Sequence, residues 1–109
     1  ANPEFGASRH VAGTVLAAAA VDPSVRAAIN VRTDEALLAA ARERGFDPLR
    51  VDADYDDRNR RLRERFREDG VRPVVYHEGA FGIEPVTYVL GSTAVDAVRR
   101  LADLIPADR

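Results

Sequence analysis

Hydrophobic residues recur along the chain with two different periods, and these periods predict its secondary structure. Apolar positions spaced by three and four residues are typical of helices, and apolar residues that alternate or form short runs are typical of strands. The helical pattern predicts helices over residues 8–20, 33–44, 56–69 and 92–105. The strand pattern predicts strands over residues 28–32, 49–52, 73–76 and 85–90, with a short helix as the alternative for the last segment. This alternation favours an α/β fold in which helices cover a sheet.

Turn and capping residues mark the ends of the predicted helices. Gly6 is expected to form a turn, after which Ser8 caps the first helix. Gly45 and Gly70 end the second and third helices, because glycine readily adopts the left-handed backbone found there. The motif at residues 92–96, Ser-Thr-x-x-Asp, resembles a capping box for the last helix. The faces expected to be buried are, helix by helix, Val11, Val15, Leu16 and Ala19; Leu37, Leu38 and Ala41; Leu62 and Phe66; and Ala94, Val98, Leu101, Ala102 and Ile105.

The composition is that of an ordinary folded chain. Its 109 residues are 46% hydrophobic and 31% charged, which suits one domain over residues 1–109. There is no cysteine, so disulfides and thiolate chemistry are excluded. No apolar run approaches the roughly 20 residues that span a bilayer, and no signal-peptide pattern opens the chain. We therefore expect a cytoplasmic protein without a membrane partner.

The charges narrow the chemistry further. The net charge is -2, which gives no general attraction to nucleic acid. All 16 basic residues are arginines, so no lysine can act as a base, form a Schiff base or clamp a phosphate. The arginine-rich segment 56–69 also carries acidic residues at i,i+4 positions, as in Arg60 and Glu64. We interpret that segment as a solvated helix face and not as a nucleic-acid surface.

The first candidate site is the segment Gly6-Ala7-Ser8-Arg9-His10. A glycine turn that leads into a helix exposes unpaired backbone N–H groups and the positive end of the helix dipole, which together bind anions. Ser8 can add a hydroxyl, and Arg9 or His10 a charge or a proton. The alternative is an ordinary capped helix without a ligand.

Two further candidates follow predicted strands. Asn30 and Arg32 share one face of a strand and stand near its carboxyl end, where ligands gather in open α/β sheets. Asp52 ends the next strand and begins the acidic segment 52–57, whose carboxylates could hold Mg²⁺. The alternatives are a solvent-facing pair and an acidic helix N-terminus.

The fourth candidate is the loop that follows the third predicted strand. Gly79 and Gly82 allow positive φ and a close approach to a ligand, and Glu84 could bind an amine or a hydroxyl. A plain turn between strands is the alternative. His10 and His77 lie far apart in the sequence, and no zinc, P-loop or nucleophile-elbow motif is present. We therefore expect no metal site and no resident cofactor.

Four segments together resemble the ThiN family, archaeal-type thiamine-phosphate synthase domains. They are Phe-Gly-Ala-Ser-Arg-His-Val-Ala from residue 5, Arg-Ala-Ala-Ile-Asn-Val-Arg from residue 26, the segment at Asp52, and residues 79–91. The resemblance covers nearly all of this chain but only about the C-terminal two-thirds of the family domain. We accordingly expect the chain to be a piece of a longer protein.

The resemblance implies a fold and a reaction. The fold is a three-layer α/β/α domain with a mixed, largely antiparallel sheet. In the reaction a pyrimidine pyrophosphate loses pyrophosphate as a thiazole phosphate attacks, which gives thiamine phosphate. Mg²⁺ is then expected only as the companion of a pyrophosphate ligand. The resemblance makes His10 the functionally important histidine and Ser8 part of a phosphate cradle, and it places Asn30, Asp52, Gly82 and Glu84 at the pocket.

Three departures from the family pattern favour a second branch of the family, whose members are fused to helix-turn-helix regions and regulate transcription in response to thiamine. The catalytic arginine that the resemblance implies lies upstream of residue 1. The segment 52–57 differs from the Asp-Arg-x-x-Glu-Pro of synthases, and Ile83 stands where synthases tend to have lysine. Our first hypothesis is therefore the thiamine phosphate-sensing domain of a transcriptional regulator, which would bind DNA only through a missing upstream region. The alternative is a thiamine-phosphate synthase domain, and a homodimer is compatible with both.

Overall fold

The computed structural model describes residues 3–53 and 57–105, with side chains from residue 9 onward. Within these ranges the helices are α1 (Pro3–Ala19), α2 (Glu35–Glu43), α3 (Arg58–Asp69) and α4 (Ala94–Leu104). The strands are β1 (Ala27–Arg32), β2 (Leu49–Arg50), β3 (Val74–Tyr76) and β4 (Val86–Gly91). The predicted order of elements is confirmed, and the segment with the helical alternative is a strand, β4.

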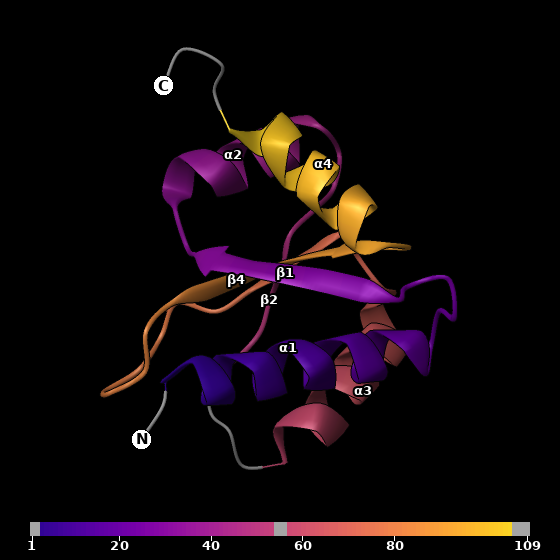
Figure 1. Cartoon of the computed structure of the whole chain (residues 1–109), viewed down its shortest axis with the longest axis vertical. Helices are drawn as coiled ribbons and strands as arrows, with labels where there is room; N and C mark the ends of the chain where they lie inside the picture. Colours follow the sequence, from indigo (N-terminus) through magenta and orange to yellow (C-terminus); the bar gives the residue numbers. More distant parts are fainter. Residues whose placement is uncertain (1–2, 54–56, 106–109) are drawn as a thin grey trace.

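The sheet is mixed and lies between two layers of helices. Its strand order is β1-β4-β3-β2; β4 is antiparallel to both of its neighbours, and β2 is parallel to β3. Figure 1 shows α2 and α4 on one face of the sheet and α1 and α3 on the other. The three-layer α/β/α fold with a largely antiparallel sheet is therefore confirmed.

Each face of the sheet has its own hydrophobic core. Phe66 of α3 packs with Tyr88 and Leu90 of β4 in the core beneath α1 and α3. Leu38 of α2 and Leu104 of α4 belong to the core on the opposite face. The buried faces predicted for α2 and α3 are confirmed, because all their predicted apolar residues are buried.

The start of the first helix was predicted wrongly. α1 begins at Pro3, so Gly6 and Ser8 lie inside the helix and not in a turn and at a cap. Proline suits the first helical position because its φ is already helical and the N–H that it lacks would have no partner there. Inside a helix the backbone N–H groups of residues 8–10 are directed at carbonyl groups of the preceding turn, so they are not available to a ligand.

The buried faces of α1 and α4 also differ from the prediction. α1 buries Thr14, Ala17 and Ala18, whereas Leu16 is 69% exposed. α4 buries Ala97 and Leu104, whereas Val98 and Ile105, together with Ala94 and Ala102, are exposed. Close packing explains the result on α1, because this helix turns the small residues Ala17 and Ala18 toward its neighbours and leaves Leu16 outside.

Two glycines make this close packing feasible. A Cβ atom at Gly13 of α1 would lie 2.5 Å from Oδ1 of Asn59 on α3. A Cβ atom at Gly91, the last residue of β4, would lie 2.7 Å from the backbone nitrogen of Ala97. Because neither glycine has a side chain, α1 can lie against α3 and the first turn of α4 can lie against the sheet. The predicted cap of α4 is present, as Thr93 accepts a hydrogen bond from the Asp96 N–H at 3.0 Å.

Candidate functional site

His77 is the most unusual polar residue in the structure. It follows β3 directly and is only 2% exposed. Its backbone N–H donates to the carbonyl of Val86, and its own carbonyl accepts from the Thr33 hydroxyl at 3.0 Å. Its ring Nδ1 accepts a hydrogen bond from the Gly79 N–H at 3.1 Å. The backbone and one side of the ring are thus fixed by three hydrogen bonds.

The other ring nitrogen of His77, Nε2, differs from Nδ1 in its hydrogen bonding. Nε2 is buried and has no hydrogen-bond partner among the residues that the structure describes. Since Nδ1 acts as an acceptor, Nε2 must carry the proton of the neutral ring. The ring therefore presents a buried N–H donor without a protein acceptor in residues 9–53 and 57–105. A buried donor of this kind is a frequent feature of a binding site, because the ligand supplies the acceptor.

A cavity of about 200 Å³ is lined in part by His77, and we call it the His77 cavity. Asp52, after β2, and Arg58, the first residue of α3, contribute charges of opposite sign. The full lining consists of Val51, Asp52, Arg58, Arg61, Leu62, Glu64, Arg65, Glu68 and His77. The cavity thus offers cations, carboxylates and one neutral donor over an apolar floor.

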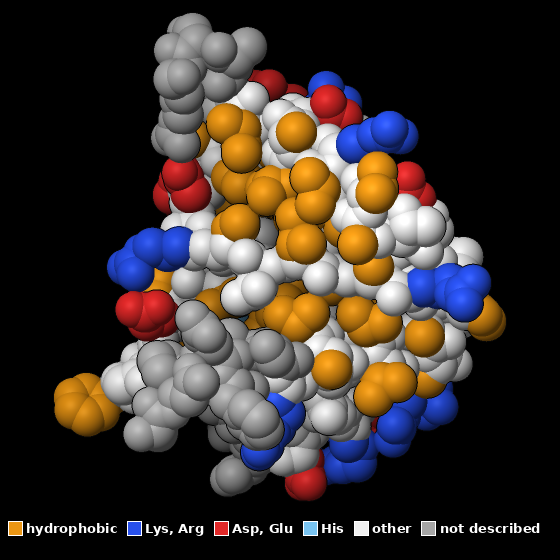
Figure 2. Space-filling model, in the orientation of Figure 1, with side chains coloured by type: hydrophobic (Ala, Val, Ile, Leu, Met, Phe, Trp, Pro, Cys, Tyr) orange, Lys and Arg blue, Asp and Glu red, His pale blue; other side chains and the backbone are white. Residues whose placement is uncertain are grey.

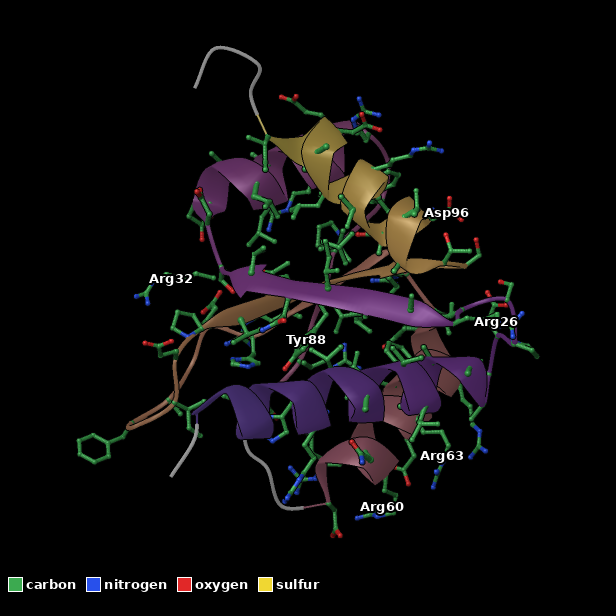
Figure 3. All side chains as sticks on the ribbon, viewed as in Figure 1. Arg26, Arg32, Arg60, Arg63, Tyr88 and Asp96 are labelled. Atoms are coloured by element: carbon green, nitrogen blue, oxygen red, sulfur yellow. The ribbon has the colours of Figure 1, made fainter. Side chains whose placement is uncertain are left out.

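Arg58 connects the helical layer to the sheet. Its guanidinium donates to the Thr14 hydroxyl at 2.7 Å and lies over the Tyr88 ring at 5.4 Å from the ring centroid. Thr14 in turn donates to the carbonyl of His10, also at 2.7 Å. Figure 3 shows Tyr88 directed from the sheet toward α1. Arg58 is therefore held from two sides, which fixes a positive charge between α1, α3 and β4.

Arg58 also lines a second cavity, of about 370 Å³, and we call it the His10 cavity. It is lined by Arg9, His10, Asp57, Arg58, Asn59 and Arg60. Because Arg58 lines both cavities, one ligand that extends from one cavity to the other could contact Arg58. The positive balance of this lining suits an anionic group such as phosphate.

Both histidines are held in the neutral form near neutral pH. Burial lowers the pKa of His77, and the charge of Arg58 lowers it further, as does His10 when it is protonated. Burial also lowers the pKa of His10, with Arg58 and Arg9 as further causes. Each neutral imidazole can donate one hydrogen bond and accept another, whereas Arg58 supplies a fixed positive charge. The cluster is thus suited to binding a phosphorylated ligand and to moving a proton at a nitrogen of His10.

The structure brings together some of the predicted site residues. Asp52 lines the His77 cavity, and Arg9 and His10 line the His10 cavity. Asn30 lies opposite Tyr88 in the β1–β4 register, which places it beside the ring that Arg58 covers.

The other predicted residues lie elsewhere. Arg32 and Glu84 form an ion pair at 3.9 Å between largely exposed side chains, and Gly82 has a φ of 76° in an exposed turn. Figure 3 shows Arg32 directed outward from the end of β1. The side chain of Ser8 and the residues 54–56 of the acidic segment lie outside the described part of the chain.

Sequence analysis missed Arg58, His77 and Tyr88. The rule that selected Asp52, a polar residue directly after a buried strand, applies equally to His77 but was not used there. Arg58 was hidden in a run of arginines that pattern alone assigns to solvent. Tyr88 was read only as part of a strand. The contacts of Arg58 with Thr14 and Tyr88 link positions far apart along the chain, and no local sequence pattern indicates them.

Among the side chains that the structure describes, no group of three or more histidine, aspartate or glutamate residues is placed to hold a metal ion. In the same part of the chain no helix is both long enough and apolar enough to span a membrane.

Comparison with known proteins adds the family. The ThiN model, described as thiamine-phosphate synthase ThiN, matches residues 1–103. The chain is 30% identical over 105 residues to the bifunctional thiamine biosynthesis protein ThiDN of Methanocaldococcus jannaschii, covering 90% of this chain and 25% of that protein. It is also 30% identical over 110 residues to thiamine-phosphate synthase ThiN of Methanothermobacter thermautotrophicus, covering 87% of this chain and 56% of that protein.

Solved structures agree with these matches. The C-terminal domain of protein MJ0236 is similar with a TM-score of 0.76 and 26% identity, over 91% of this chain and 57% of that one. The C-terminal domain of a phosphomethylpyrimidine kinase is similar with a TM-score of 0.73 and 26% identity, over 88% of this chain and 60% of that one. The chain thus spans roughly a quarter to three-fifths of these relatives. On the match to residues 1–103, the chain belongs to the ThiN family.

Proposed function

We propose that this chain is the C-terminal part of a thiamine-phosphate synthase domain and that it binds a phosphorylated thiamine-type ligand across the His77 and His10 cavities. The observation that carries the proposal is the buried Nε2–H of His77, a residue that lines a cavity; this donor has no acceptor among the described residues. The family match supplies the chemical class of the ligand.

The residues around the cavities suit the reaction expected of such a domain. Joining a pyrimidine to a thiazole phosphate releases pyrophosphate, so the site must stabilise developing negative charge. In a chain without lysine, Arg58 is well placed for this role because it lines both cavities and is already held by Thr14 and Tyr88. Neutral His77 would donate to a ligand oxygen or nitrogen, and His10 would act nearer the phosphate end. Mg²⁺ would arrive only with the pyrophosphate.

Two considerations favour the synthase proposal over the regulator hypothesis. The relatives are named for thiamine biosynthesis and thiamine-phosphate synthesis. In addition, Ile83, on which the regulator hypothesis depends, lies in the turn before β4 and pairs with Ala80, outside the lining of both cavities. The difference at position 83 therefore lies outside the lining of the candidate site in this chain. The altered segment 52–57 still leaves Asp52 at the His77 cavity.

Binding by this chain is tested by titration calorimetry with thiamine phosphate and, separately, with inorganic pyrophosphate. We expect heat from both ligands with the native chain. Arg58→Met should weaken binding at least tenfold, since a charge-assisted hydrogen bond contributes about 1.5–3 kcal/mol. Arg63→Met is the matched control, because Arg63 is on the same helix and lines neither cavity. Figure 3 shows its side chain directed away from the sheet. Equal losses in both variants would contradict the proposed site.

Turnover is a separate question, because the chain spans 56% of the Methanothermobacter protein. The test uses the full-length protein with a pyrimidine pyrophosphate and a thiazole phosphate as substrates. Thiamine phosphate should form, and His10→Ala should abolish its formation while leaving the fold intact. Tight binding of thiamine phosphate without any product would instead support the regulator hypothesis.

A further inference from the structure

Thr14 is a fully buried polar residue of α1. It is 0% exposed, and it lines neither the His77 cavity nor the His10 cavity. One turn further along the helix, Ala17 and Ala18 are buried in the apolar core beneath α1 and α3. A hydroxyl group at such a position raises the free energy of the folded chain unless hydrogen bonds replace those that it made with water. The hydrogen bonds of Thr14 therefore indicate the role of this residue.

The two hydrogen bonds of the Thr14 hydroxyl have fixed directions. A guanidinium group can only donate, so Thr14 Oγ1 accepts from Nη2 of Arg58 at 2.7 Å. The single hydroxyl proton is then donated to the His10 carbonyl, also at 2.7 Å, four residues earlier in the helix. Valine, which has the same shape but no hydroxyl, could form neither bond. Thr14 thus joins the backbone of α1 at His10 to the charged end of Arg58 on α3.

A second buried residue supports the same guanidinium. The Arg58 guanidinium carbon lies 5.4 Å from the centroid of the Tyr88 ring, within the range of a cation–π interaction. Tyr88 belongs to β4, is 3% exposed and lines neither cavity. Arg58 itself lines both cavities. The residue that reaches both cavities is therefore supported by two residues that reach neither.

Arg58 differs in this respect from the arginines of the surface. The Arg32 side chain is 71% exposed, and its ion pair with Glu84 spans 3.9 Å. Figure 2 shows most of the cationic side chains on one face of the molecule as separate groups near its rim. A ligand that binds a mobile arginine must order the side chain, which lowers the affinity about two- to tenfold. Because Arg58 is ordered when the chain folds, a ligand that binds it would avoid this loss.

We propose that Thr14 is a positioning residue, which holds the Arg58 guanidinium at the two cavities and thereby raises the affinity for an anionic ligand that Thr14 itself does not touch. For its ligand the inference rests on the proposed function, whereas the position of Arg58 is measurable in the unliganded chain. Thr14→Val removes the hydroxyl and keeps the β-branched shape. Its affinity for the anion should fall about two- to tenfold, since the ligand must then order the freed guanidinium.

The two histidines report the position of Arg58 without a ligand. The charge of Arg58 contributes to the lowered pKa of both His10 and His77, although burial is the larger cause. In Thr14→Val the guanidinium is free to move away, so the pKa of each histidine should rise part of the way toward 6.5. The other charged groups that line the cavities are unchanged in this variant; they are Arg9, Asp57 and Arg60 at the His10 cavity and Asp52, Arg61, Glu64, Arg65 and Glu68 at the His77 cavity. A rise in both pKa values therefore reports movement of Arg58.

Nuclear magnetic resonance and titration calorimetry test the proposal on the same variants. The ring signals of His10 and His77 are identified by their disappearance in His10→Gln and His77→Phe, and they are followed between about pH 4 and 8. Calorimetry uses inorganic pyrophosphate as the probe. Thr14→Val should show raised histidine pKa values and weaker binding, whereas Thr14→Ser, which keeps the hydroxyl, should resemble the native chain in both. Thr93→Val is the matched control, because it removes a hydroxyl that accepts a hydrogen bond at α4, on the other face of the sheet, and it should change neither.

Raised pKa values with weaker binding in Thr14→Val, both restored in Thr14→Ser, support the proposal. Unchanged pKa values or unchanged affinity in Thr14→Val would overturn it, because Arg58 would then act without Thr14. Equal losses of affinity in Thr14→Val and Thr93→Val would also overturn it, because affinity would then follow stability alone. No heat from pyrophosphate with the native chain would contradict the proposed function, and in that case the pKa values alone decide whether Thr14 positions Arg58. Circular dichroism establishes that each variant remains folded, and Thr14→Ala, which also lacks the hydroxyl, replaces Thr14→Val if that variant unfolds.

Discussion

His77→Phe is expected to weaken ligand binding while leaving the unliganded protein as stable as before or more stable. Phenylalanine keeps a planar ring in the buried position and removes both ring nitrogens. The variant therefore removes the Nε2–H donor that has no acceptor in the described part of the chain, together with the Nδ1 bond to Gly79. The larger ring can be accommodated because the His77 cavity, of about 200 Å³, adjoins it.

The expected change in the free energy of unfolding is the difference between two opposing contributions. A buried donor without an acceptor costs about 1–3 kcal/mol, and a neutral hydrogen bond such as that from Gly79 contributes about 0.5–1.5 kcal/mol. Their difference predicts that the free energy of unfolding of His77→Phe changes by between about −0.5 and +2.5 kcal/mol, which is a gain over most of that range. In a domain of this size each kcal/mol corresponds to roughly 4–8 °C in Tm. Ligand affinity should fall at least tenfold, since the donor that the ligand would satisfy is gone.

The assay measures stability and affinity on the same protein. Urea unfolding followed by circular dichroism gives the free energy of unfolding, and titration calorimetry with thiamine phosphate gives the affinity. His77→Gln is the conservative comparison, because its amide can place a donor near the position of Nε2 and should retain more of the affinity. Tyr76→Phe is the matched aromatic control, since Tyr76 is buried on the opposite face of the sheet. It should leave affinity unchanged.

Two results would refute this reasoning. A loss of more than about 2 kcal/mol in His77→Phe would exceed what the Gly79 bond can explain. It would mean that Nε2–H already has a strong partner in the folded chain. Unchanged affinity in His77→Phe would mean that no ligand accepts from this ring. Either result would remove the observation on which the proposed site rests.

Four further predictions concern stability. Folding lowers the pKa of His10 and His77, so below about pH 6.5, the unperturbed histidine pKa, the unfolded chain takes up protons before the folded chain does. The free energy of unfolding should therefore fall as the pH drops, and it should fall less in His77→Phe. Gly91→Ala should cost about 1–3 kcal/mol, because its Cβ meets backbone. Gly13→Ala should change stability by less than about 1 kcal/mol, because it meets only an exposed side chain that can turn away, and alanine favours the helix. Phe66→Ala, at a fully buried site, should cost about 3–5 kcal/mol. Urea unfolding measures all four variants, and a larger loss at Gly13 than at Gly91 would contradict the packing described.

Local sequence rules predicted most helices and strands correctly, because the start and end of each element depend on residues that are neighbours in the sequence. The glycines that end α2 and α3 and the polar residues that cap α4 act within one helical turn, and their positions were predicted correctly. The first helix was an exception. There two helix-start signals competed, Pro3 at the first position and the Gly6–Ser8 pair, and the upstream proline determines the start.

The candidate site was only partly predictable because it is assembled from distant segments. His10, Asp52 and His77 come from α1, the end of β2 and the end of β3. Sequence position identified Asp52 and His10, but nothing local indicates that Arg58 reaches Thr14 and Tyr88. That arrangement depends on Gly13 and on the alanines of α1, which let the helix approach α3 and the sheet.

The errors on α1 and α4 have a common physical meaning. In both helices the apolar stripe predicted to face the core includes residues that are exposed in a single chain, Leu16 on α1 and Val98 and Ile105 on α4. A hydrophobic stripe records burial in the complete assembly, whereas the structure of one chain records burial within that chain alone. The stripes predicted for α1 and α4 therefore mark apolar residues, but the neighbours of each helix decide which of its faces is buried. α1 packs against α3 and β1, and α4 packs against β4 and β1.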